Sequence, residues 1–138
     1  MTWFLWALLS AFFAGLTAIL AKIGVEHVNS NLATAIRTIV ILVFAWSVAL
    51  FTKTQSLATI GRKTWIFLVL SGFATGLSWL CYFRALQLGE ASQVAPVDKL
   101  SVVIAIVLAA VFLHERMTWH HWVGGSLIFV GAVVLAYA

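Results

Sequence analysis

Residues 31–52 read NLATAIRTIVILVFAWSVALFT, a run of 22 residues whose one charged side chain is Arg37. A helix needs about 20 mostly apolar residues to cross the roughly 30 Å hydrocarbon core of a bilayer, so this run is long enough to span it. The chain around it has the same character, with 64% hydrophobic and 9% charged residues among 138 and a mean hydropathy of +1.10. Because soluble domains carry about 25% charged residues, this composition excludes a water-soluble globule and predicts an integral membrane protein.

Five stretches of the chain meet the length requirement for a membrane span. They cover approximately residues 3–21, 31–52, 65–86, 94–113 and 119–137. Each stretch is continuously apolar and not alternating, which favours helices over the strands of a membrane barrel. The connections between them are too short to hold another domain. The sequence therefore predicts an all-α fold, with residues 1–138 forming a single domain of five transmembrane helices.

The orientation of these helices follows from tryptophans and cations. Five of the seven tryptophans fall at the membrane face shared with the N-terminus: Trp3, Trp6, Trp65, Trp119 and Trp122. Loops on that face hold the cations Lys53, Arg62, Lys63 and Arg116, whereas the other face holds Lys22 in a loop and Arg37, Arg84 and Lys99 near span ends. The loop cations alone place the N-terminus in the cytoplasm. All cations together divide four to four, so fixed and dual orientation both stay open.

Ionisable residues inside spans are the first candidates for function, because they are costly to place in lipid. Arg37 lies about 9 Å into the second span and Asp98 about 6 Å into the fourth, at 1.5 Å per residue. Their opposite charges allow two interpretations, a structural ion pair between spans or a vestibule that binds a charged solute. Asp98 and Lys99 point about 100° apart on a helix, so we expect them not to neutralise each other. Pro96 is expected in the first turn of the fourth span, where its missing N–H costs little.

Polar and aromatic side chains also follow one face of several spans. Thr75, Trp79 and Tyr82 share a face of the third span, and Ser101 follows Asp98 on the fourth. Such stripes predict the walls of a wetted cavity, with hydrogen bonding between helices as the alternative. The candidate solute-binding residues are therefore Arg37, Asp98, Lys99, Trp79, Tyr82, Ser101 and Thr75.

Small residues mark candidate sites of close helix contact. Gly124 and Gly131 lie one heptad apart on the fifth span, and Gly72 and Gly76 form a G-x-x-x-G pair on the third. These positions predict packing or dimer contacts. The chain has no catalytic motif, and its histidines do not have metal-ligand spacing, so we expect no enzyme activity, metal or cofactor. The net charge of +4 is explained by membrane anchors, and no nucleic-acid partner is expected.

Three segments of the sequence resemble the EamA-like family of the drug/metabolite transporter superfamily. Residues 82–97, YFRALQLGEASQVAPV, are similar to the family's aromatic, Ala-Leu and Ala-Pro pattern. Residues 113–118, LHERMT, and 122–131, WVGGSLIFVG, are similar to its L-G-E-R-x-T and G-x-x-L-I-x-x-G segments. This chain departs from the family pattern at His114, where a glycine is usual, and at the charged pair Asp98-Lys99.

The resemblance implies half of a transporter, because most family members join two five-span repeats of opposite orientation. A single repeat could reproduce that arrangement as an antiparallel homodimer in the cytoplasmic (inner) membrane, moving a small metabolite or amphipathic solute by alternating access. The alternative is a non-transporting subunit of a lipid-handling or transport complex.

Overall fold

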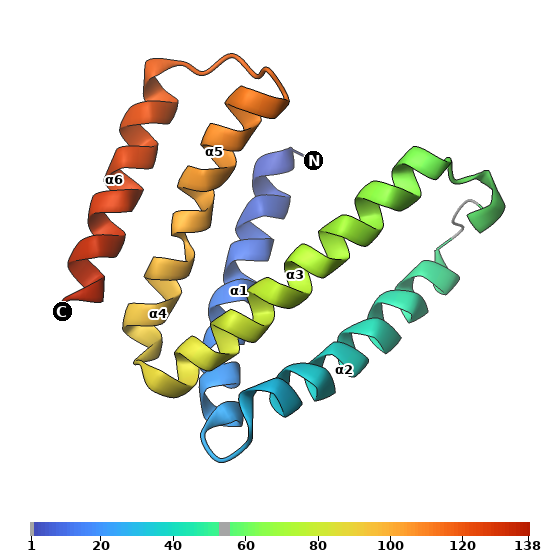
Figure 1. Ribbon diagram of the computed structural model, residues 1–138, viewed down its shortest axis with the longest axis horizontal. Coiled ribbons are helices and arrows are strands. Elements are labelled where there is room, and N and C mark those ends of the chain that lie inside the picture. Colours follow the sequence, from blue (N-terminus) through green and yellow to red (C-terminus); the bar gives the residue numbers. More distant parts are fainter. Residues whose placement is uncertain (1, 53–55) are drawn as a thin grey trace. The chain divides into compact units, whose positions relative to one another are not determined.

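The computed structural model describes residues 2–52 and 56–138, and its long elements are helices (Figure 1). The elements are α1 (Trp3–Val25), α2 (Ser30–Phe51), the short 3-10 helix η1 (Leu57–Thr59), α3 (Arg62–Leu88), α4 (Ala91–Asp98), α5 (Leu100–Phe112) and α6 (Trp119–Ala136). Within the described residues, five helical segments are long and apolar enough to cross a membrane, with α4 and α5 together forming one. The predicted all-α membrane fold is confirmed. Lys53, counted above among the loop cations, lies outside the described residues.

Two helices are longer than the apolar runs that predict them. α1 continues past residue 21 to Val25 and includes Lys22, and α3 begins at Arg62 ahead of residue 65. Hydropathy locates the part of a helix that lies in lipid, whereas Lys and Arg are good helix formers whose long stems carry their charges toward the interface. At α2, the Asn29 side chain accepts hydrogen bonds from the N–H groups of Asn31 and Leu32 and so fixes where the helix begins.

The fourth span differs from its prediction, because it is a broken helix. α4 begins at Ala91, so Pro96 is its sixth residue and lies in the helix interior, not in the first turn. Proline has no N–H to complete the helical bond to the residue four earlier. α4 ends two residues later, at Asp98, and the Lys99 N–H donates to the Pro96 carbonyl at 3.0 Å. The Val102 N–H in turn donates to the Lys99 carbonyl at 3.0 Å, which gives the junction with α5 a tighter, 3-10-like turn.

The chain divides into two compact units, of which the first contains α1 up to Ile23 and Leu88–Ala138. In this unit α6 runs back along α4 and α5 and packs against both (Figure 1). Ala132 on α6 is buried, and a Cβ atom built on Gly125 would lie 3.5 Å from the Ile106 side chain. The Lys22 ammonium donates to the Gly89 carbonyl at 2.8 Å, which ties the end of α1 to the turn before α4.

The second unit, Gly24–Gln87, contains α2, η1 and most of α3. Its clearest tie is the Gln87 side-chain amide near the end of α3, which donates to the Val25 carbonyl at 3.0 Å and to the Val28 carbonyl at 2.5 Å. These bonds hold the end of α3 against the turn that precedes α2. The bond to Val25 also satisfies one of the carbonyls that the end of α1 leaves without an intrahelical partner.

Candidate functional site

The second unit holds a cluster of one cation and two aromatic rings. Arg37 comes from the second turn of α2, and its guanidinium carbon lies 4.7 Å from the centre of the Trp79 ring. The same carbon lies 5.3 Å from the centre of the Phe83 ring. Both distances are within the range of a cation–π interaction, worth about 0.5–2 kcal/mol depending on desolvation. We call Arg37, Trp79 and Phe83 the arginine–aromatic site.

The helical period of α3 brings the two rings to the same cation. Trp79 and Phe83 are four residues apart, so their side chains lie one above the other on a single face. Phe83 is buried and Trp79 half-buried. Tyr82 packs edge-on against Phe83, with ring centres 6.4 Å apart. The sequence analysis named Trp79 and Tyr82 but missed Phe83, which the spacing of four from Trp79 could have indicated.

The charge of Arg37 is not balanced within its own unit. Among residues 24–52 and 56–87, Glu26 is the one carboxylate, and no ion pair joins it to Arg37. Nor does this part of the chain show a hydrogen bond from the guanidinium. The nearby hydroxyls donate to their own helix: Thr34 to the Ser30 carbonyl at 2.8 Å and Thr38 to the Thr34 carbonyl at 2.7 Å. The arrangement therefore leaves a half-buried cation with its N–H donors available.

Asp98 and Lys99, in the first unit, form an ion pair with Nζ and Oδ2 3.2 Å apart. The expectation that these neighbours do not neutralise each other is wrong. Their Cβ atoms diverge as on any helix, but the helix ends at this point and the four-carbon lysine stem is long enough to turn back. The pair is partly open, with 34% of the Asp98 side chain and 55% of the Lys99 side chain exposed. The alternative of an Arg37–Asp98 ion pair stays a prediction.

The two remaining residues predicted to contact the solute, Thr75 and Ser101, are close in sequence to Trp79 and to Lys99. Thr75 is exposed one turn before Trp79 on α3, and Ser101 is exposed in the first turn of α5, two residues after Lys99. The structure thus brings Arg37 and Trp79 into contact and pairs Asp98 with Lys99. Among the described residues it shows no side-chain hydrogen bond for Thr75 or Ser101.

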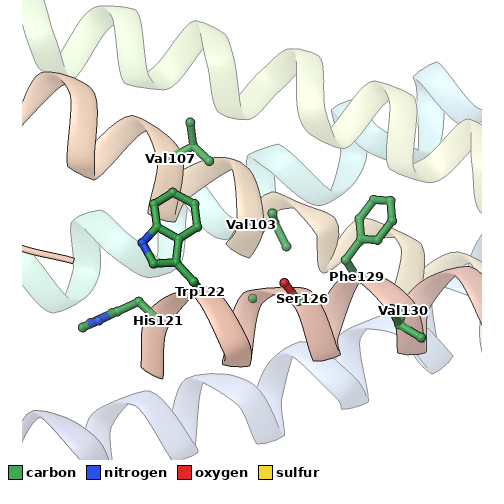
Figure 2. Close-up of a pocket in the computed structure, with 8 residues that line it drawn as sticks. Val103, Val107, His121, Trp122, Ser126, Phe129 and Val130 are labelled. Carbon is green, nitrogen blue, oxygen red and sulfur yellow. The ribbon is translucent and has the colours of Figure 1, made fainter. Parts of the chain in front are cut away.

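A separate apolar groove of about 380 Å³ lies between α5 and α6 (Figure 2). Figure 2 shows Val103 and Val107 of α5 facing Trp122 and Phe129 of α6, with Ser126 between the aromatic residues. Ser126, His121 and the indole N–H of Trp122 are the polar side-chain groups of its lining. With no charged wall, this groove suits hydrocarbon or an apolar helix surface more than a charged solute.

The predicted contact glycines face open space. Gly72, Gly76, Gly124 and Gly131 have no neighbouring atom within 4 Å of an added Cβ atom. Instead α6 packs within its unit through Gly125, one residue on from the predicted seam and about 100° around the helix. Gly125 was not selected from the sequence, because Gly124 and Gly125 are both glycines and their sequence does not tell which of the two faces the neighbouring helix. A dimer contact at Gly124 and Gly131 stays a prediction.

One of the histidines near α6, His121, helps to cap the start of that helix. The Thr118 N–H donates to His121 Nδ1 at 3.1 Å, and the Thr118 hydroxyl lies 2.8 Å from the same atom. Within residues 2–52 and 56–138, no three His, Cys, Asp or Glu side chains gather where one metal ion could bind them.

Comparison with known proteins identifies the family behind this geometry. The sequence profile of the EamA-like transporter family matches residues 1–137, and so essentially the whole chain. The chain belongs to the EamA-like transporter family. It is therefore a multi-pass membrane protein of a transporter family, as its motifs and five apolar helices indicate.

Individual EamA-like relatives agree with this assignment. An uncharacterised transporter from Sinorhizobium, named for its position in the cobO 3′ region, is 52% identical over 136 residues, covering 98% of this chain and 96% of that protein. A probable 4-amino-4-deoxy-L-arabinose-phosphoundecaprenol flippase subunit, ArnE, from Aeromonas hydrophila is 32% identical over 74 residues, covering 54% and 63%. The uncharacterised transporter YvbV from Bacillus subtilis is 38% identical over 68 residues, covering 49% of this chain and 22% of that protein. No solved structure matches.

Proposed function

We propose that this EamA-like chain is a half-size transporter subunit that works as an antiparallel homodimer in the cytoplasmic membrane. The observation that carries the proposal is the arginine–aromatic site, a cation held on two rings within membrane helices and unpaired in its own unit. Membrane-embedded charges of this kind mark solute pathways by default, because lipid penalises them. The comparisons support a subunit, since the Sinorhizobium transporter aligns to this chain over 96% of its own length, whereas YvbV aligns over 22% of its own length.

The mechanism follows from the pairing of two inverted copies. Each copy contributes one solute-facing set, with Arg37, Trp79 and Tyr82 as the primary contacts and Asp98, Lys99, Thr75 and Ser101 as the secondary ones. Inverted repeats can rock about a central solute so that access alternates between the two faces. The solute drives this change only to the extent that it binds the two states differently. Gly124 and Gly131 on α6, and Gly72 and Gly76 on α3, provide the smooth surfaces for close helix approach between copies.

The first test is topology. Two C-terminal reporters, one active only in the cytoplasm and one only outside it, are each fused to the complete chain. Activity of both supports the antiparallel homodimer, because the chain must then insert in both directions. Activity of the outside reporter alone places the N-terminus in the cytoplasm in every copy. That result would contradict the antiparallel homodimer.

A second candidate function is suggested by the ArnE relatives, which are named as flippase subunits. In this reading the chain is a subunit of a lipid-handling complex and acts only with a different protein. The two functions differ in what the purified chain does in liposomes. A transporter homodimer supports solute counterflow alone, whereas an assembly subunit is inactive until its partner is added.

A further inference from the structure

We propose that the arginine–aromatic site binds the anionic group, a carboxylate or a phosphate, of the solute. This inference rests on the proposed transport function and specifies its substrate class. It is carried by three observations: the position of Arg37 within a span, its contact with two aromatic rings, and the lack of a carboxylate partner among residues 24–52 and 56–87.

The depth of Arg37 in the membrane makes its charge unfavourable. Arg37 is the eighth residue of α2, so it lies about 10 Å from the start of the helix at 1.5 Å per residue. A charge at this depth is unfavourable unless a counter-charge or water accompanies it. Glu26, the one carboxylate among residues 24–52 and 56–87, lies outside the spans and forms no ion pair with Arg37. An anion brought by the solute supplies the missing counter-charge.

The rings determine how the guanidinium can be approached. The guanidinium carbon of Arg37 lies over the Trp79 ring at 4.7 Å and over the Phe83 ring at 5.3 Å. The five N–H donors point outward in the plane of the guanidinium, and residues 24–52 and 56–87 show no hydrogen bond from them. Two of these donors match the two oxygens of a carboxylate or phosphate in a fork geometry. The rings thus fix the orientation of a group that recognises anions.

The same site disfavours cationic solutes. A positively charged ligand would place two like charges together in a low-dielectric setting, where repulsion is weakly screened. The half-buried Trp79 ring can still contact a hydrocarbon or ring attached to the anionic group. The preferred ligand is therefore an amphipathic anion.

The test is calorimetric binding to the purified full-length chain in nanodiscs of phosphatidylcholine. The probes are benzoate and phenyl phosphate, with neutral benzamide and cationic benzyltrimethylammonium as matched comparisons. The variants are Arg37→Gln, which removes the charge, and Arg37→Lys, which keeps the charge but loses the fork. Arg62→Gln is the control, because Arg62 is an exposed arginine at the start of α3 in the same unit.

We expect both anions to bind more tightly than benzamide or the cation. Arg37→Gln should weaken anion binding about tenfold or more, because a charge-assisted bidentate contact is lost. Arg37→Lys should give a smaller loss, and Arg62→Gln should leave the dissociation constants unchanged. Equal binding of benzamide and benzoate, tighter binding of the cation, or unchanged anion binding by Arg37→Gln overturns the proposal. If Arg37→Gln does not fold, the Arg37→Lys variant and the ranking of the four probes decide the question.

A second arm separates a lipid headgroup from a soluble anion as the natural source. Phosphatidic acid is added to the nanodiscs and the phenyl phosphate titration is repeated. Strong competition assigns the site to a lipid phosphate, and no competition assigns it to a soluble solute; both outcomes support an anion site. Because binding is measured without transport, anion binding with no counterflow rejects only the transport function. Counterflow that does not depend on Arg37 or on probe charge rejects only the anion site.

Discussion

Replacing Gln87 with alanine should destabilise the chain more than its exposure suggests. The Gln87 amide donates to the Val25 carbonyl at 3.0 Å and to the Val28 carbonyl, while its oxygen accepts from Arg84 Nη1 at 3.1 Å. Each hydrogen bond contributes about 1 kcal/mol net, and a partly buried carbonyl left without a donor adds to the loss. The two bonds to the turn therefore predict a decrease in unfolding free energy of about 2 kcal/mol for Gln87→Ala.

The assay is detergent denaturation of the purified chain, with helix content followed by far-ultraviolet circular dichroism. Gln93→Ala is the control, because Gln93 has similar half-burial on α4 but no side-chain hydrogen bond in the described structure. Gln87→Glu sharpens the test: it keeps the size of the side chain but replaces the donor with an acceptor facing two carbonyls. We expect Gln87→Glu to be at least as destabilising as Gln87→Ala. Equal denaturation midpoints for Gln87→Ala and Gln93→Ala would show that the two Gln87 hydrogen bonds do not stabilise the chain.

Three further predictions concern helix ends and contact faces. His114 has a φ of 52°, which is a left-handed backbone conformation. In the same denaturation assay, His114→Gly should leave the free energy of unfolding unchanged or raise it by up to about 1 kcal/mol. His114→Val should lower the free energy of unfolding, because a β-branched residue is strained in this conformation. Thr118→Ala should cost about 1 kcal/mol by removing the cap of α6, and Thr118→Ser should cost less, measured as shifts in the same midpoint. Gly124→Leu should leave stability within about 0.5 kcal/mol, because its surroundings are open, yet reduce chemical crosslinking between copies. Gly125→Ala is its control: the added Cβ meets Ile106 at an ordinary 3.5 Å, so neither stability nor crosslinking should fall.

The fold could be predicted from the sequence because lipid imposes a simple rule. Every backbone polar group in the membrane must be satisfied within the helix, so a run of sufficient length and hydropathy gives a helix almost regardless of its neighbours. Residues 31–52 and the observed helix Ser30–Phe51 illustrate this. The broken fourth span could not be predicted in the same way, because hydropathy averages over the span and does not register the tighter turn at Lys99.

Two of the three residues of the arginine–aromatic site, Arg37 and Trp79, were selected from the sequence, but their contact was not predicted. Arg37 and Trp79 were each selected for being polar or aromatic within a span, yet their contact depends on how α2 and α3 are rotated about their axes. Hydropathy gives the depth of a residue in the membrane and leaves this rotation undetermined. Phe83 was missed for a related reason: an isolated phenylalanine in a membrane helix looks like any lipid-facing residue until a cation is found beside it.

The charge of Arg37 and the charges of the Asp98–Lys99 pair are compensated in different ways. Lys99 is the ninth of the 22 residues in Ala91–Phe112, so it lies about 12 Å from the start of that span, within a core of about 30 Å. A single charge there would be costly, but the neighbouring Asp98 cancels it through an ion pair that needs no other helix. Arg37 has no such neighbour on α2 and relies on ring faces that attract its charge without cancelling it. Compensation for Arg37 must therefore come from another element or from the solute, which is why this residue, and not the Asp98–Lys99 pair, should control which charge the protein accepts.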